Sequence, residues 1–155
     1  MEHSELAAQI QYLADIEAIK QLKATYCYHI DDRQIEPLME RFTDDAVWDG
    51  GPAGRYEGKA AIEKFLVELP TEQLSFALHW VLNPLITIDG DTAKARWYLI
   101  EPCTSARSGR ALWGAGHYDD TCVREHGVWK FSEVILKQIF WTPFDQGWAI
   151  KPGVG

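Results

Sequence analysis

The chain has 155 residues, of which 46% are hydrophobic, so it is long enough to bury one core of ordinary size, and we expect a single domain over residues 1–155. Its formal net charge of −8, without a run of lysines or arginines, argues against a nucleic-acid partner and against an anionic membrane surface. The first ten residues lack the basic and apolar parts of a leader, and no uncharged stretch approaches membrane-spanning length, so the sequence predicts a cytoplasmic protein.

Two helices are expected at the start of the chain. The pattern of Ser4–Leu13 predicts a short helix. Asp15 is a plausible N-cap for a longer one, in which apolar residues recur every three or four positions as far as Asp31.

Two further helical segments are expected before the strands. Asp32 can cap the first of them, which tolerates Pro37 in its first turn. The second is Gly58–Leu69, which we expect Pro70 to close.

After Pro70 the hydrophobic period falls to two, which predicts strands. They are expected at Ser75–Asn83, Leu85–Ile88, Thr92–Ile100, Ala111–Arg124 and Val128–Trp141, with hairpin turns at 89–91 and 125–127. Helices followed by a meander predict an α+β fold class, in which a curved antiparallel or mixed sheet forms a cone around the N-terminal helices. The tail, residues 142–155, is a candidate flap over a pocket.

A candidate acid–base pair comes from the end of the long helix and the first strand. Asp31 stands beside apolar Ile30, where the helix macrodipole favours positive charge. Strand alternation places His79 on a largely apolar face, where desolvation lowers the pKa of a histidine unless a carboxylate offsets it. If Asp31 accepted the Nδ1 proton, Nε2 of His79 would be free to take a proton from a ligand. Spacing alone leaves the alternative of an ordinary core histidine open.

Four stretches of sequence carry a family resemblance. They are AIKQLKATYCYHIDDRQ (18–34), FTDDAVWDG (42–50) with YEGKAAIEKF (56–65), LHWVLNP (78–84) and GHYDDTCVREHGVWKFSEV (116–134). With them the chain resembles the SnoaL-like family of the nuclear-transport-factor-like superfamily, whose members have a cystatin-like α+β cone fold. The nearest resemblance is to the group that contains hexachlorocyclohexane dehydrochlorinase, bile-acid 7α-dehydratase and, more remotely, scytalone dehydratase.

The resemblance implies roles for three residues. The family uses the pair that matches Asp31 and His79 as its proton-abstracting dyad. Tyr26 precedes Asp31 by five residues, which matches the tyrosine of the bile-acid dehydratase pattern. Its phenol could polarise a carbonyl or protonate a leaving hydroxyl, although a core tyrosine is an equally good interpretation.

Aromatic side chains are abundant, with seven tryptophans, six tyrosines and six phenylalanines, so they could line a pocket as well as fill a core. The candidate substrate-binding residues are Trp48, Trp97, Trp113, His117 and Phe144. His117 has a surface role as its alternative. Glu101 is the only carboxylate near a strand end that could serve as a further acid.

Metals and cofactors are not expected. Cys27, Cys103 and Cys122 are widely spaced and form no C-x-x-C pair, which favours buried thiols. His, Asp and Glu show no metal-binding spacing. This agrees with the cofactor-free chemistry that the resemblance implies.

The sequence and the resemblance together predict a cofactor-independent lyase, of the dehydratase or dehydrohalogenase type, or an isomerase. Its partner would be a small, mainly apolar cyclic substrate, from which the His79–Asp31 dyad removes a proton. The alternatives are a non-catalytic ligand-binding or assembly module, and a ketosteroid-isomerase-like enzyme with Asp31 as the base. An apolar outer strand face predicts a homo-oligomer, a dimer or a trimer. That face carries Phe76, Leu78, Trp80 and Leu82.

Overall fold

The computed structural model of the chain describes residues 3–150, and its sheet is preceded by one long helix. In chain order the elements are α1 (His3–Asp31), α2 (Ile35–Met39), β1 (Phe42–Asp49), the 3-10 turn η1 (Gly51–Ala53), β2 (Arg55–Glu57), α3 (Lys59–Glu72), β3 (Leu74–Ala77), β4 (Trp80–Asp89), β5 (Thr92–Ser105), β6 (Ala111–Glu125) and β7 (Val128–Pro143).

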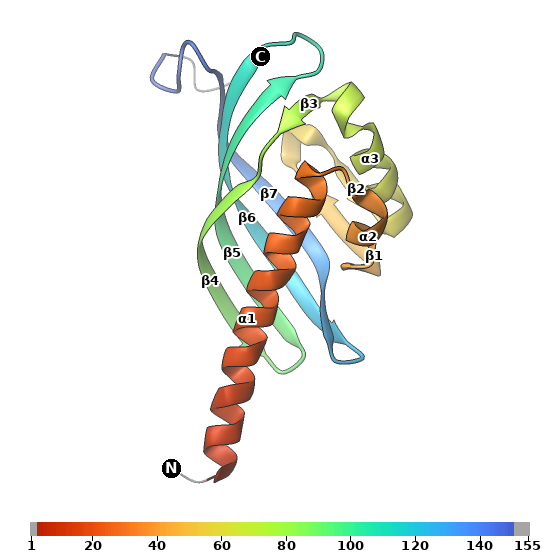
Figure 1. Cartoon of the computed structure of the whole chain (residues 1–155), viewed down its shortest axis with the longest axis vertical. Helices are drawn as coiled ribbons and strands as arrows, with labels where there is room; N and C mark the ends of the chain where they lie inside the picture. The colour runs from red at the N-terminus through yellow and green to blue at the C-terminus, as the bar shows by residue number, and fades with distance from the viewer. Residues whose placement is uncertain (1–2, 151–155) are drawn as a thin grey trace.

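The strands form one curled sheet in the order β2-β1-β7-β6-β5-β3, and β4 also pairs with β5. β1 runs parallel to β7, and the other pairs are antiparallel. The sheet curves around α1, while α2 and α3 lie next to β1 and β2 (Figure 1). The predicted fold class, an α+β domain with a curved mixed sheet around an N-terminal helix, is therefore confirmed.

The core lies between α1 and the concave face of the sheet. Alternation along each strand directs every second side chain to that face. The buried residues that meet there include Ile19, Leu22, Tyr26 and Ile30 of α1, Ala93, Ala95, Trp97 and Leu99 of β5, and Phe131 and Val134 of β7. Lys23 of α1 is also fully buried and pairs with Asp120 of β6 at 3.0 Å. This pairing compensates both charges inside the core.

The expectation of two N-terminal helices is wrong, because α1 is continuous from His3 to Asp31. Nothing between Leu13 and Asp15 breaks the helix, since the intervening Ala14 is the best helix former. The helix ends where Arg33 adopts a left-handed conformation with φ of 61°.

The other helix boundaries also differ from expectation. Asp32 does not cap α2, because its backbone N–H donates to Tyr28 in the last turn of α1, and Gln34 precedes α2 instead. Pro70 does not close α3, which continues to Glu72. Proline removes one hydrogen bond, but the next turn still closes through the Gln73 N–H and the Leu69 carbonyl at 3.0 Å.

The strand predicted at Ser75–Asn83 is interrupted in the structure. β3 ends at Ala77 and β4 begins at Trp80, so His79 lies between two strands. β4 then continues past the predicted break at Asn83, whose φ of 52° accompanies a shift in register between Leu82 and Leu85. The predicted hairpin turns at 89–91 and 125–127 are confirmed.

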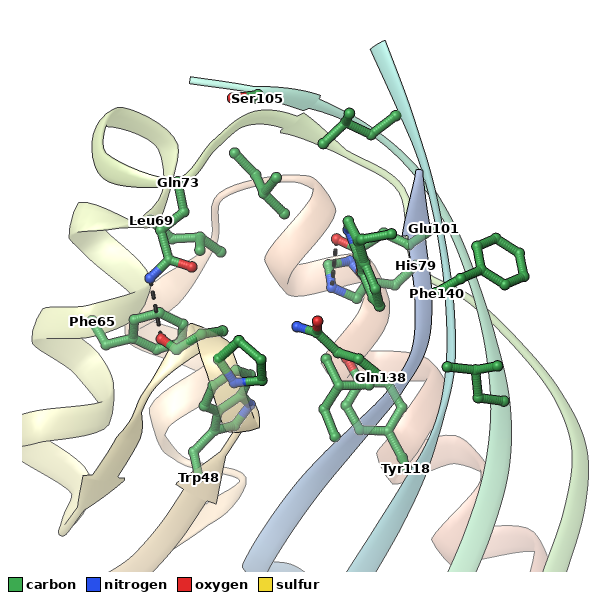
Figure 2. Close-up of a pocket in the computed structure, with 17 residues that line it drawn as sticks. Trp48, Phe65, Leu69, Gln73, His79, Glu101, Ser105, Tyr118, Gln138 and Phe140 are labelled. Atoms are coloured by element: carbon green, nitrogen blue, oxygen red, sulfur yellow. Dashed lines mark hydrogen bonds and ion pairs between the residues drawn. The ribbon is translucent and has the colours of Figure 1, made fainter. Parts of the chain in front are cut away.

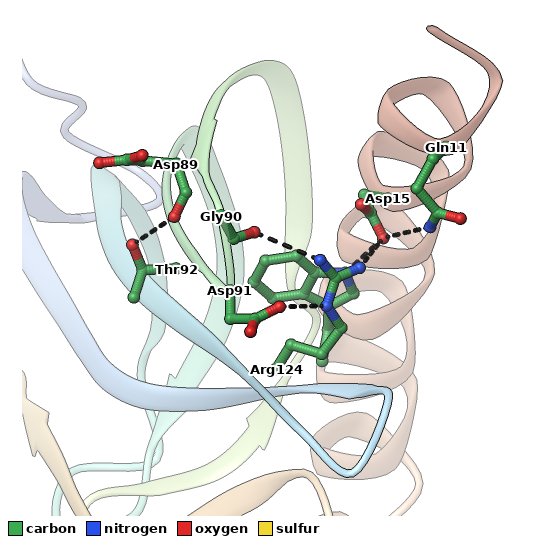
Figure 3. A network of polar contacts seen from close by, with 8 residues as sticks. Gln11, Asp15, Asp89, Gly90, Asp91, Thr92 and Arg124 are labelled. Carbon is green, nitrogen blue, oxygen red and sulfur yellow. Dashed lines mark hydrogen bonds and ion pairs between the residues drawn. The ribbon is translucent and has the colours of Figure 1, made fainter. Parts of the chain in front are cut away.

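A polar network ties α1 to two hairpins at the end of the sheet (Figure 3). The Oδ1 atom of Asp15 accepts hydrogen bonds from Arg124 Nη1 at 2.7 Å, Trp129 Nε1 at 3.0 Å and Gln11 Nε2 at 3.2 Å. Arg124 Nε also donates to Asp91 at 2.8 Å. Burial raises the pKa of Asp15, but the donors from Trp129 and Arg124 outweigh burial, so the pKa lies below its ordinary value. Asp15 is thus a tertiary anchor rather than a cap.

We predict that Asp15→Ala lowers the free energy of unfolding by about 2–3 kcal/mol, because it removes hydrogen bonds to a charged acceptor and leaves the buried Trp129 N–H unpaired. Urea unfolding at pH 7 measures this loss. Glu17→Ala, which changes an exposed acid of the same helix, is the matched control and should cost far less. Since the pKa of folded Asp15 is depressed, its contribution is present above the unfolded pKa and is lost as the pH falls through the folded pKa. Equal stability of the two variants at pH 7 would contradict the anchoring role.

Candidate active site

The carboxylate of Asp31, at the end of α1, binds His79, which lies in the break between β3 and β4. The Nδ1 atom of His79 lies 2.7 Å from Asp31 Oδ1. The backbone N–H of His79 donates to both carboxylate oxygens, at 3.2 and 3.1 Å. This N–H is thereby paired with Asp31 instead of with a neighbouring strand, which explains why the strand breaks at His79. The expected contact between Asp31 and His79 is confirmed.

A second acid faces the other nitrogen of the imidazole. Alternation on β5 turns Glu101 inward with Leu99 and Cys103, and its side chain is only 3% exposed. Its Oε1 lies 3.9 Å from His79 Nε2. Figure 2 shows the two side chains facing each other beside the cavity. The sequence indicates Glu101 as a possible acid. The predicted strand ends at Ile100, however, so the pattern does not predict that the Glu101 side chain points inward.

The surroundings of the site change the protonation of His79 and of Glu101. Burial raises the pKa of Glu101. Burial alone would lower the pKa of His79, but the charge of Glu101 and the hydrogen bond to Asp31 outweigh burial, so the pKa of His79 is raised. The charges of His79 and Glu101 thus each favour the charged form of the other group.

The imidazole and Glu101 open into a cavity of about 530 Å³. Trp48, Phe65 and Leu69 line the side formed by β1 and α3, and Leu112, Leu136 and Trp141 line the side formed by the sheet. The Trp141 ring approaches β6 closely because its partner there is a glycine: a Cβ at Gly114 would come within 2.3 Å of the ring. A volume of this size with a mostly apolar lining is typical of sites for small organic ligands.

Two tyrosines form the floor beneath the dyad. Tyr26 is fully buried, its hydroxyl accepts a hydrogen bond from Trp48 Nε1 at 2.8 Å, and its ring meets the His79 ring edge-on at 6.5 Å. Tyr118 lines the cavity and hydrogen-bonds with Tyr26. Burial raises the pKa of both phenols, so both stay protonated. Tyr118 rather than Tyr26 is therefore the phenol that faces the cavity.

Only some of the predicted substrate-binding residues line the cavity. Trp48 lines the cavity, whereas Trp97, Trp113, His117 and Phe144 do not. Trp97 points inward but is part of the core below the site. Trp113 and His117 lie on the other face of β6 from Leu112 and Tyr118, because alternate residues of a strand point in opposite directions.

The C-terminal tail packs against rings rather than across the dyad. Phe144 stacks on Trp113 at 6.0 Å, and Trp148 stacks on Phe140, at the edge of the cavity, at 5.2 Å. Neither Phe144 nor Trp148 lines the cavity. The end of the predicted flap, residues 151–155, lies outside the described residues.

Within residues 3–150, no group of three or more His, Cys, Asp or Glu side chains is placed to hold a metal ion. The helices in this part of the chain are too short or too polar to cross a membrane.

Comparisons with known proteins agree with this architecture. The model of the SnoaL-like domain matches residues 11–135. An uncharacterized protein of Mycobacterium tuberculosis, Rv2910c, is 32% identical over 133 residues, which are 83% of this chain and 88% of that protein.

Solved structures with low sequence identity share the fold. The type 3 hexachlorocyclohexane dehydrochlorinase LinA from Novosphingobium barchaimii superposes with a TM-score of 0.81 at 22% identity, covering 88% of this chain and 94% of that one. A cystatin-like protein from Nostoc punctiforme has a TM-score of 0.68 at 20% identity, covering 81% and 91% of the two chains.

We predict that the pKa of His79, followed by NMR of its ring nitrogens, lies above the ordinary value in the wild-type protein and falls in both Asp31→Asn and Glu101→Gln. Each variant removes a negative charge that stabilises the imidazolium. His117, which lies outside the cavity, serves as an internal reference in the same spectra and should not respond. Since the folded pKa is raised, protonation of His79 stabilises the fold below the unfolded pKa, and this contribution is lost as the pH rises through the folded value. An unchanged His79 titration in both variants would refute the coupling.

Proposed function

Because the chain belongs to the SnoaL-like family, we propose that it is a cofactor-independent lyase or isomerase acting on a small, mainly apolar cyclic substrate. The observation that carries the proposal is the arrangement of His79, which is held at Nδ1 by Asp31 and presents Nε2 to the cavity and to Glu101. An imidazole fixed in this tautomer is suited to accept a proton from a bound ligand.

In the proposed reaction, neutral His79 removes a proton from a ring carbon that an adjacent carbonyl acidifies. Asp31 stabilises the imidazolium that forms. Asp31 itself is less suited as the base, because both its oxygens already accept hydrogen bonds from His79. This argues against the ketosteroid-isomerase-like alternative.

Glu101 supplies the acid that a dehydration needs. Burial raises the pKa of Glu101, so its carboxyl group can hold a proton and donate it to a leaving hydroxyl. The C–H and C–O bonds break, a C=C bond forms and water leaves. The imidazolium and the new carboxylate then lie 3.9 Å apart, and proton transfer between them restores the starting state.

The proximity of base and acid further defines the chemistry. His79 and Glu101 lie on the same side of the cavity, so the geometry favours loss of a proton and a hydroxyl from one face of the ring. A halide leaves without a proton and has no need of Glu101. Dehydration is therefore favoured over dehydrohalogenation.

We predict that His79→Ala abolishes turnover and that Asp31→Asn lowers kcat by about a hundredfold or more with little change in binding, since proton transfer by a positioned group contributes that much. Glu101→Gln should lower the rate of dehydration by a similar factor. It should leave the exchange between solvent and the substrate proton that His79 removes intact. Substrates are found by screening hydroxy-ketones, cyclic enones and chlorinated rings. The wild-type rate of dehydration should rise with pH as His79 becomes neutral and fall again at higher pH as Glu101 loses its proton.

Asp32→Asn, which makes the same change at the exposed neighbour, is the matched control and should keep full activity. Turnover by His79→Ala at the wild-type rate would refute the mechanism. A ligand that binds without reacting in any assay would favour the binding-module alternative.

We also propose that the protein is a homo-oligomer. Phe76, Trp80 and Leu82, predicted for the outer face, are each about half exposed, and Leu85 and Tyr98 extend the patch at 69% and 53% exposed. Several exposed apolar side chains on the outer strands favour association with a second copy.

Trp80→Arg together with Leu82→Arg should therefore shift sedimentation at micromolar concentration toward the monomer, because charges would have to be buried in the interface. Val67→Arg, at an equally exposed apolar residue of α3, is the control and should not change the oligomer. A wild-type protein that sediments only as a monomer would contradict this proposal.

A further inference from the structure

The charge of the cavity restricts which ligands it can hold. Among residues 3–150, its lining contains one histidine and one carboxylate, and no lysine or arginine. With Asp31 ionised, the group of Asp31, His79 and Glu101 carries a net charge of zero or less, wherever its protons lie. A carboxylate or phosphate would therefore lose its hydration without gaining an opposite charge.

Three basic side chains among the described residues are held in other contacts. Lys23 pairs with buried Asp120, Arg33 donates to the Ser75 carbonyl at 3.1 Å, and Arg110 pairs with Asp145 at 3.3 Å. None of the three lines the cavity.

Gln138 of β7 is the polar side chain that remains available. Figure 2 shows its amide pointing into the cavity, between His79 and Trp48. Among the described residues its amide has no hydrogen-bond partner, in contrast to the side chains of Gln73 and Ser105, which also line the cavity. Gln73 donates to the Ala53 carbonyl at 3.2 Å, and the Ser105 hydroxyl accepts from the Ser108 N–H at 3.2 Å.

A bulge built into β7 positions this amide. Gly116 of β6 pairs with Gln138 and Ala115 pairs with Phe140, so Ile139 is the extra residue. A Cβ at Gly116 would lie 2.4 Å from the Lys137 carbonyl oxygen, which explains the glycine at this point. The bulge changes the alternation of β7, so Gln138 and Trp141, three residues apart, both line the cavity.

We propose that the cavity selects an uncharged ring ketone and that the Gln138 amide donates a hydrogen bond to the ketone oxygen. This deepens the proposed function, on which it rests, because it names the substrate class and a further substrate-binding residue. When His79 removes the adjacent proton, negative charge develops on that oxygen, and a donor already aimed at it stabilises the charge.

The test measures binding alone, by calorimetry at pH 7, with four probes of one ring system. They are 2-tetralone, tetralin, tetralin-2-carboxylate and 2-aminotetralin. In the wild-type protein we expect 2-tetralone to bind most tightly, with an affinity about tenfold or more higher than that of the carboxylate. Gln138→Leu should remove the preference for 2-tetralone over tetralin. One hydrogen bond corresponds to about a 2- to 12-fold difference in affinity, and the affinity for tetralin should not fall.

Two control variants test whether the effect is specific to the amide of Gln138. Gln21→Leu makes the same change on the exposed surface of α1 and should retain the preference. Gln138→Met keeps the length of the side chain and should behave like Gln138→Leu. Circular dichroism checks that every variant is folded.

The outcomes separate this inference from the proposed function. His79→Ala should keep the preference for the ketone even when turnover is lost, because the preference does not depend on proton transfer. Tightest binding of the carboxylate or the amine, an unchanged preference in both Gln138 variants, or no binding of any probe near millimolar concentration would each overturn the inference. A preserved preference together with full turnover by His79→Ala would refute the mechanism alone.

Discussion

The site depends on one carboxylate that binds both the backbone and the side chain of the same residue. Asp31 accepts the N–H of His79 and holds its imidazole. Without a polar partner, the unpaired N–H at the break between β3 and β4 would cost free energy. The carboxylate satisfies that group and fixes the ring with the same two oxygens. The end of α1, the strand break and the orientation of His79 are thus one structural feature.

This feature places charged groups where they lower the stability of the fold, and packing does not require them there. Asp31 stands at the end of a helix where the macrodipole is unfavourable, and Glu101 is buried beside an imidazole. Apolar residues of similar volume would often stabilise such positions better than charged ones. Lys23 and Asp120 at least neutralise each other, whereas the group around His79 has no positive excess. Its arrangement is understandable if a proton moves there during a reaction on an uncharged ligand.

Hydrophobic periodicity predicted much of the fold, because the long strands and the hairpin turns of this sheet have strong local signals. It failed where tertiary contacts decide the local structure. Asp15 looks like an N-cap from its neighbours alone, and only Arg124 and Trp129, more than a hundred residues away, make it an anchor inside a helix. The break at His79 was also invisible, because it depends on a hydrogen bond from another element. β1 and β2 are short or irregular and were not predicted as strands.

The site was predicted in part, for equally physical reasons. The family pattern identified Asp31, His79 and Tyr26, and the structure brings these three together. The aromatic candidates were chosen by residue type, and alternation on β6 turns Trp113 and His117 to the other face. Gln138 gave no signal, because its direction depends on a bulge that requires Gly116 on the neighbouring strand.

In the proposed mechanism, Nε2 of His79 removes a proton from carbon. The most direct measurement is exchange of the acidic C–H of a bound ring ketone in deuterium oxide, followed by NMR of the ketone. The wild-type protein should accelerate this exchange well above the rate in buffer, and His79→Ala, although it still binds the ketone, should not. Equal exchange rates with the wild-type protein, with His79→Ala and in buffer alone would contradict it.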